Sequence, residues 1–119
     1  MSKTIYEQIG GEAAVTAAVD LFYEKILADD LLMEFFQDVN MTFLKAHQKS
    51  LITFLCGGNN AYKGKDLRTA HRHLKLEEVH FDQIVLHLTD TLNELGVPED
   101  IVSKIIEKIE FLRFEVLNL

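Results

Sequence analysis

Apolar residues recur every three or four positions along most of this sequence, which is the spacing of amphipathic helices. No segment alternates between apolar and polar residues for long enough to predict a β-strand. The spacing predicts short helical pieces before Gly10 and over Leu31–Phe36, and four longer helices: about 12–29, from Leu44 to the glycines at 57–58, from about His80 to Gly96, and from Ile101 to Val116. The sequence therefore predicts an all-α fold.

The middle of the chain departs from this regularity. The segment AYKGKDLRTAHRHLKLEEVH, residues 61–80, has weak periodicity and predicts a loop with one short helix around Leu67–His73. Connections between helices in compact domains are usually much shorter than about twenty residues. Either this segment is mobile, or a group that the chain does not encode, such as a bound prosthetic group, organises it.

Two polar side chains interrupt the apolar face of the helix that begins at Leu44. His47 and Gln48 lie on the same predicted face as the apolar residues of this helix, Leu44, Leu51, Ile52 and Leu55. Burying an imidazole or an amide without a partner costs about 1–3 kcal/mol each, so both side chains need partners. The simplest account of His47 is a core histidine bonded to a backbone carbonyl.

Other side chains with ligand-binding chemistry accompany this pair. Tyr23 lies on the apolar stripe of the preceding long helix, and His71 lies in the weakly structured middle. Phe35 and Phe36 add flat apolar surface at the corner between the two helices. Imidazoles and a phenol can bind a metal or hydrogen-bond a small ligand, and aromatic surface packs against a flat ring. The combination suits a flat cofactor that carries a metal at its centre.

The remaining histidines are expected to be structural or solvated. His73 is two residues from His71, so on a helix the two point about 200° apart and do not share a ligand direction. We expect His80 to cap or pack at the start of its helix, and His87, beside the apolar stripe, to be solvated. A non-haem metal site has no support, because no carboxylate or further histidine lies three or four residues from His47 or His71. A hydrolytic triad has none either, because no serine lies in a nucleophile-elbow motif.

Composition narrows the class of protein. The 119 residues suffice for one domain, and the formal net charge of −7 disfavours nucleic acids and anionic membranes as partners. No apolar run approaches the roughly 18 residues that span a bilayer. The N-terminus lacks the apolar region of a secretory signal, so we expect a cytoplasmic protein. The single cysteine, Cys56, excludes an internal disulfide and is expected to be a small buried side chain.

Five stretches are specific as an ordered set, although each is weak alone. They are IYEQIGGEAAV, FYEKILADDLLMEFFQDVNM, AHQKSLITFLCGG, YKGKDLRTAH and HFDQIVLHLTDTLNELGVPED. In these stretches the chain resembles the truncated haemoglobins of group I, over essentially its whole length. The resemblance implies a single truncated globin domain over residues 1–119. Its fold would be a two-over-two helical sandwich around haem b, with an extended middle loop that leads to the proximal histidine.

The resemblance implies roles for the polar residues. His71, in RTAH, corresponds to the proximal ligand of the haem iron, to which neutral imidazole is well suited. Tyr23 and Gln48 correspond to a distal tyrosine and glutamine that stabilise bound O2 as hydrogen-bond donors. In cyanobacterial members, a histidine at the position of His47 binds the iron when no other ligand is present, which implies a hexacoordinate state here. The alternative is a His47 that is swung out or loosely hydrogen-bonded.

The resemblance also implies contacts with the cofactor. Tyr62, Lys65 and Arg68 lie in a segment that can reach the haem propionates. The residues expected around the ring are Phe35, Phe36, Leu44, Phe54, Leu55, Leu76, Phe81, Ile84 and Leu88.

Three positions depart from the family pattern. Leu44 replaces a glutamine that many relatives carry, so polar stabilisation of a ligand rests on fewer groups. Leu112 stands where some cyanobacterial relatives have a histidine that becomes covalently attached to haem, so we expect no crosslink. Ile52 replaces a phenylalanine thought to gate a ligand tunnel.

The function implied is binding of O2, NO and CO at iron in a monomeric protein, for O2 transport or for oxidation of NO to nitrate. The second activity would depend on a cellular reductase that returns ferric iron to the ferrous state. A rival is an electron-transfer or redox-sensing haem protein, which a stable bis-histidine iron would favour. From another class, the chain could be a cofactor-free helical binding module whose histidine and glutamine bridge core waters.

Overall fold

The computed structural model describes residues 3–58 and 74–117, and all regular secondary structure in these two ranges is helical. The elements are, in order, α1 (Ile5–Ile9), α2 (Gly11–Leu27), η1 (Met33–Phe36, a 3-10 helix), α3 (Met41–Leu55), α5 (Glu78–Glu94), α6 (Glu99–Glu110) and α7 (Arg113–Leu117). Among the described helices, none combines the length and the apolar character needed to cross a membrane.

Short-range hydrogen bonds explain where the first helices begin and end. Thr4 and Glu7 form a capping box at the start of α1, with both hydrogen bonds at 3.1 Å. Gly10 has a φ of 116°, which other residues rarely adopt, and so lets the chain turn from α1 directly into α2. The side chain of Asn40 accepts a hydrogen bond from the Phe43 N–H and starts α3.

His80 has the structural role that its position in the sequence predicts. Its Nδ1 accepts a hydrogen bond from the Glu77 N–H at 2.9 Å and completes a capping box at the start of α5. Its ring also lies edge-on to Phe35, with the centroids 4.9 Å apart. The prediction that His80 caps or packs at the start of its helix is confirmed.

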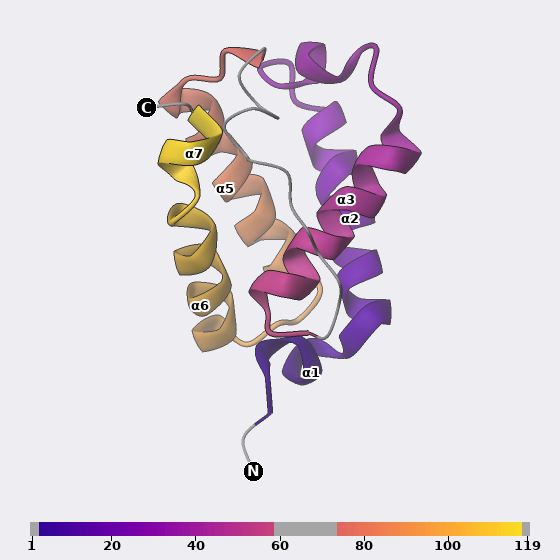
Figure 1. The fold of residues 1–119 in the computed structure, drawn as a ribbon, viewed down its shortest axis with the longest axis vertical. Coiled ribbons are helices and arrows are strands. Elements are labelled where there is room, and N and C mark those ends of the chain that lie inside the picture. Colours follow the sequence, from indigo (N-terminus) through magenta and orange to yellow (C-terminus); the bar gives the residue numbers. More distant parts are fainter. Residues whose placement is uncertain (1–2, 59–73, 118–119) are drawn as a thin grey trace.

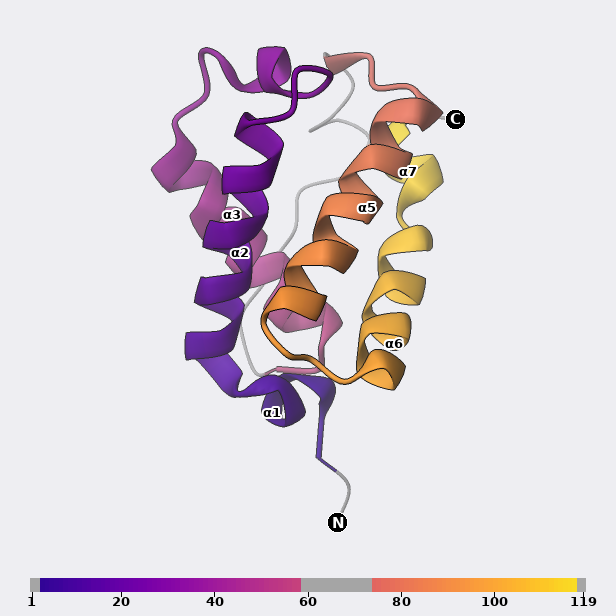
Figure 2. The same ribbon diagram turned by 180° about the vertical axis from the view of Figure 1, so that it is seen from behind.

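The four long helices form two pairs (Figure 1). The α2–α3 pair lies on one side of the molecule and the α5–α6 pair on the other, as the opposite views show (Figures 1 and 2). Helix α2 contacts both α3 and α5 and so joins the pairs, while α1 packs against α2 near the N-terminal end. This arrangement is the predicted two-over-two sandwich.

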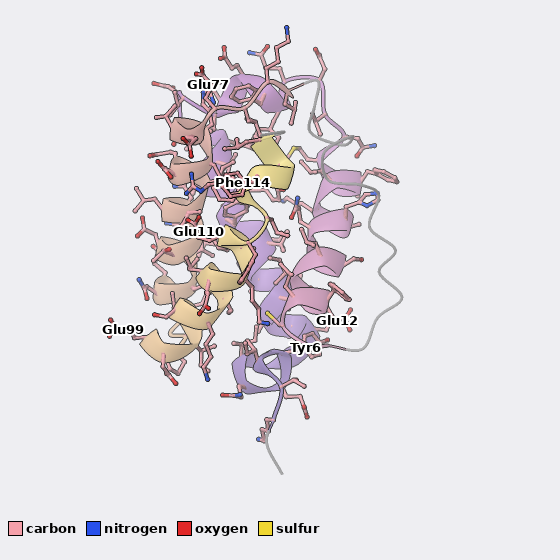
Figure 3. The ribbon with its side chains drawn as sticks, turned by 60° about the vertical axis from the view of Figure 1, so that its left-hand side comes forward. Tyr6, Glu12, Glu77, Glu99, Glu110 and Phe114 are labelled. Atoms are coloured by element: carbon pink, nitrogen blue, oxygen red, sulfur yellow. The ribbon has the colours of Figure 1, made fainter. Side chains whose placement is uncertain are left out.

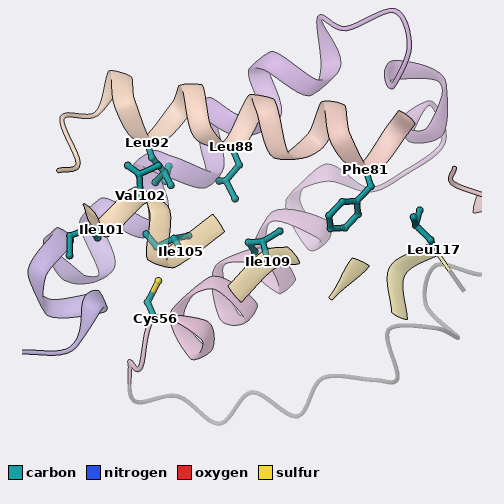
Figure 4. Packing of buried hydrophobic residues seen from close by; sticks show 10 residues of the cluster. Cys56, Phe81, Leu88, Leu92, Ile101, Val102, Ile105, Ile109 and Leu117 are labelled. Carbon is teal, nitrogen blue, oxygen red and sulfur yellow. The ribbon is translucent and has the colours of Figure 1, made fainter. Parts of the chain in front are cut away.

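The larger cluster of buried side chains lies mainly between α5 and α6 (Figure 4). Its labelled members are Cys56, Phe81, Leu88, Leu92, Ile101, Val102, Ile105, Ile109 and Leu117. Cys56 is 2% exposed, which confirms the predicted small buried side chain. Burial raises the pKa of its thiol to about 11, so it remains a neutral thiol near neutral pH.

The last predicted helix is divided in two. The sequence predicts one helix from Ile101 to Val116, but α6 ends at Glu110 and residues 111–112 form a turn. The Arg113 guanidinium bonds to Glu110 at 2.9 Å and to Asp82 on α5 at 2.7 Å, and it lies 4.6 Å from the centroid of the Phe81 ring. These contacts hold α7 against α5. Figure 3 labels Glu110, at the end of α6, and Phe114, in α7, on either side of the turn.

Candidate functional site

Tyr23 is the buried polar residue of α2. Its side chain is 3% exposed and forms a hydrogen bond with the side chain of Gln48 on α3. Burial raises the pKa of the phenol well above its ordinary value, and the bond to Gln48 opposes this only in part. The site therefore contains a neutral hydroxyl group that interacts with an amide from the neighbouring helix.

Aromatic rings pack against the ring of Tyr23. The Tyr23 ring lies edge-on to Phe22, with centroids 5.0 Å apart, and to Phe36 of η1, with centroids 6.0 Å apart. Phe35 lies against His80 of α5, as described above. The two phenylalanines predicted to contact a flat cofactor thus lie between α2 and the start of α5.

Helix α3 presents an apolar face that is only partly covered. None of its residues is fully buried, and Leu44, Gln48, Ile52 and Leu55 are all half-buried. Leu44 and Ile52 pack against the cluster around Tyr23, so this face points into the molecule. The predicted face exists, and its remaining apolar surface can be covered by another flat apolar group.

His47 does not lie within this face, contrary to the predicted helical pattern. It is exposed, and its ring lies edge-on to Phe43, with centroids 4.5 Å apart. The reason is its angular position: it stands about 100° around the helix from Gln48, at the edge of the face. His47 is therefore turned away from this face, and its binding to iron stays a prediction. Phe54, predicted to contact the cofactor, is 54% exposed.

Asp29 fixes the corner that follows α2. One carboxylate oxygen accepts the Leu31 N–H at 2.9 Å, and the other lies 2.6 Å from Nε2 of His87 on α5. The bond to His87 is the main reason that the pKa of Asp29 lies below its usual range. Because the His87 side chain is 16% exposed, the prediction that it is solvated is wrong. The sequence did contain a signal for its burial: His87 lies three residues after Ile84 and four before the buried Thr91, which places the three on one helical face.

The residues that are predicted to contact the cofactor and lie in the described ranges fall, apart from Phe54, into two adjacent clusters. The cluster around Tyr23 includes Phe35, Phe36, Leu44 and Ile84. The α5–α6 cluster includes Leu55, Leu76, Phe81 and Leu88. Ile52 of α3 packs against both, so the two clusters meet at this helix.

Four predicted site residues lie outside the described residues, namely Tyr62, Lys65, Arg68 and His71. The predicted short helix over Leu67–His73 lies there as well, and these assignments stay predictions. Within residues 3–58 and 74–117, no three His, Cys, Asp or Glu side chains are grouped so as to hold a metal ion.

Comparison with known proteins places this geometry among the globins. The model of the family described as bacterial-like globin matches residues 4–118. The group 1 truncated hemoglobin of Tetrahymena thermophila is 43% identical over 115 residues, which cover 97% of this chain and 95% of that protein. The group 1 truncated hemoglobin GlbN of Synechocystis sp. is 44% identical, over 86% of each chain.

Solved structures agree in fold. The truncated hemoglobin of Tetrahymena pyriformis in its Fe(III) form has a TM-score of 0.92 and 43% identity, covering 97% of this chain and 98% of its own. The 2/2 hemoglobin of Synechococcus sp., in the cyanomet state and with covalently attached heme, has a TM-score of 0.94 and 38% identity, covering 98% and 100%. These similarities confirm the predicted all-α, two-over-two fold.

Proposed function

Since this chain belongs to the bacterial-like globin family, among its group 1 truncated haemoglobins, we propose that it binds haem b and, at the iron, O2, NO and CO. When bound, haem iron supplies the coordination position for such a diatomic ligand. The observation that carries the proposal is the buried Tyr23 phenol, bonded to Gln48 beside the partly covered apolar face of α3.

The residues present suit a porphyrin. The two clusters that meet at α3 supply aromatic and aliphatic side chains, which is the lining that a flat apolar ring needs. His71 would hold the iron through one ring nitrogen while the other donates to a backbone carbonyl. Tyr62, Lys65 and Arg68 would bind the propionates. Because Leu112 stands where a crosslinking histidine would be needed, the haem would be extractable.

Tyr23 and Gln48 would act on the ligand as hydrogen-bond donors. Burial keeps the phenol protonated, so it can donate across the physiological pH range. A hydrogen bond to a charged acceptor contributes about 1.5–3 kcal/mol, and bound O2 carries partial negative charge, so the two donors would slow its release. Leu44 donates nothing, so the stabilisation rests on this pair.

We further propose that the chain oxidises nitric oxide, as a monomer in the cytoplasm. The balanced reaction joins NO, O2 and one electron from a cellular reductase to give nitrate. The proposal is supported by the side chains around Tyr23 and Gln48. Leu44 and Ile52 offer apolar surface beside these two donors, which suits weakly polar NO next to a hydrogen-bonded O2.

The proposal of haem binding is tested by absorption spectra of the ferric, ferrous and CO-treated protein. A Soret band that shifts with CO supports it, and His71→Ala should abolish or severely weaken haem retention. His73→Ala is the matched control, two residues away, and should retain haem. Undiminished binding by His71→Ala would contradict the proximal assignment. The absence of any Soret band, with no haem uptake by the apoprotein, would favour the cofactor-free binding module.

The dioxygenase proposal has its own test. Ferrous protein equilibrated with O2 is mixed with NO in a stopped-flow instrument, and nitrate is quantified. Rapid spectral decay with stoichiometric nitrate is expected. No nitrate, together with a very slow dissociation of His47 from iron, would favour electron transfer instead.

A further inference from the structure

Phe43 and His47 form an aromatic pair on the outer side of α3. Their ring centroids are 4.5 Å apart and their planes meet at 65°, an edge-to-face contact of the kind that aromatic rings prefer. Phe43 is 66% exposed and His47 is also exposed. Burial in the core therefore does not account for this pair.

Helix geometry explains why the two rings meet. Residues four apart on a helix lie side by side, and helical side chains lean toward the N-terminus, so His47 leans over the turn that carries Phe43. Phe43 lies in the first turn of α3, where the Asn40 side chain accepts its N–H at 3.1 Å. The cap holds the backbone of Phe43, which gives the ring a fixed base.

His47 stands at the boundary between the outer and inner sides of α3. At about 100° per residue, it is about 60° around the helix from Leu44 and about 40° from Leu51, and both leucines are half-buried. Rotation about its own side-chain bonds can move the imidazole from Phe43 toward the face of Gln48. The ring cannot occupy both places, so contact with Phe43 competes with the inward position.

We propose that Phe43 is a positioning residue that holds His47 outward and so sets the fraction of molecules in which His47 can bind the iron. The inference rests on the proposed function, in which His47 is a displaceable sixth ligand. An edge-to-face pair shifts an equilibrium by about twofold to tenfold, so Phe43 biases His47 without excluding it from the iron. Exogenous ligands then compete with a smaller bound fraction of His47.

The test compares ferric wild-type protein with three variants. Phe43→Ala should raise the ratio of low-spin to high-spin absorbance by about twofold to tenfold, and Phe43→Tyr, which keeps the ring, should restore the wild-type ratio. Phe111→Ala is the matched control, because it removes a ring that is 79% exposed at the end of α6. This control should leave the ratio unchanged.

Two further measurements keep the test decisive if the wild type is already fully low-spin. After flash photolysis of the CO complex, the rate at which His47 binds the vacated iron should rise by the same factor in Phe43→Ala. In NMR spectra of the diamagnetic CO complex, Phe43→Ala should shift the ring protons of His47, because the ring current of Phe43 is lost. Unchanged His47 shifts would show that the contact is absent and overturn the inference.

His47→Ala separates the inference from the function on which it rests. If this variant converts low-spin to high-spin iron while Phe43→Ala changes neither the spin ratio nor the binding rate, the role of Phe43 is overturned and the proposed function stands. If His47→Ala leaves the spectrum unchanged, His47 is no ligand, and the inference fails while haem and CO binding still support the rest.

Discussion

The Tyr23 hydroxyl lies where bulk water cannot compete for it. Its side chain is 3% exposed, and burial raises its pKa above the ordinary value despite the bond to Gln48. The phenol therefore stays a donor at any pH near neutral, and the amide holds it toward α3. At the residue scale, this pair is the most direct target for a test of ligand stabilisation.

Tyr23→Phe should raise the rate of O2 dissociation by about tenfold to a hundredfold, because it removes one hydrogen bond worth about 1.5–3 kcal/mol to a charged acceptor. The rate is measured by displacing O2 with excess CO in a stopped-flow instrument. Tyr6→Phe, in α1, is the matched control and should keep the wild-type rate. Equal rates in Tyr23→Phe and wild type would show that the phenol does not contact the ligand.

At the scale of elements, the corner between α2 and η1 is held by a contact between distant parts of the chain. Asp29 and His87 are 58 residues apart in sequence, yet their side chains approach to 2.6 Å. Asp29 also accepts the Leu31 N–H, and Leu32, next in the corner, is fully buried. The pair thereby anchors the corner that leads into η1, which carries Phe36 against Tyr23.

Asp29→Asn should lower the free energy of unfolding by about 1–3 kcal/mol near neutral pH, because it weakens a charge-assisted hydrogen bond between partly buried groups. The folded pKa of Asp29 is depressed, so its contribution is present above the unfolded value of about 3.9 and is lost as the pH falls through the folded value. The variant and the wild type should therefore converge in acid. Urea unfolding at about pH 7 and about pH 3 measures this.

Asp30→Asn serves as the control for this experiment, since Asp30 is the neighbouring exposed carboxylate. It should change the unfolding free energy little at either pH. A loss in Asp29→Asn that is the same at both pH values would contradict the assignment of the effect to the ionised carboxylate.

At the scale of the whole molecule, the two helix pairs are not equally supported. The α5–α6 pair shares the larger buried cluster, whereas no residue of α3 is fully buried. Elements with few buried apolar contacts open at low free-energy cost. Helix α3 is therefore expected to be the weakest of the long helices when the protein lacks haem.

Haem removal should consequently speed amide hydrogen exchange in α3 far more than in α5. Haem at a hundredfold excess over its Kd should add about 2.7 kcal/mol to the stability of the whole chain, seen as a higher melting temperature. Exchange mass spectrometry of the apo and loaded protein measures the difference between helices. Equal protection of the α3 and α5 amides in the apoprotein would contradict the prediction that α3 is the weaker helix. As a control, adding haem to His71→Ala should not slow amide exchange in α3.

The positions of most helices and the capping role of His80 could be predicted from the sequence alone, because they depend on residues three or four apart. The bonds of His80 to Glu77 and of Asn40 to Phe43 are of this kind, and so are the apolar stripes of α2, α3, α5 and α6. The end of α6 at Glu110 could not be predicted in this way. The pairing of Tyr23 with Gln48 as distal donors was predicted through the family resemblance, since periodicity showed only two polar positions on apolar faces. The position of Phe35 and Phe36 at a corner could also be predicted, because the two residues lie in sequence between two long predicted helices.

Only the tertiary structure decided which distant groups meet. The break between α6 and α7 accompanies the Arg113–Asp82 contact across 31 residues, and His87 is covered because α5 lies against the corner that holds Asp29. The outward turn of His47 depends on small angular differences at the edge of a face. Backbone hydrogen bonds within a helix join residues that are close in sequence, so the local sequence determines them. The partner of a polar side chain on another helix depends on how the helices pack.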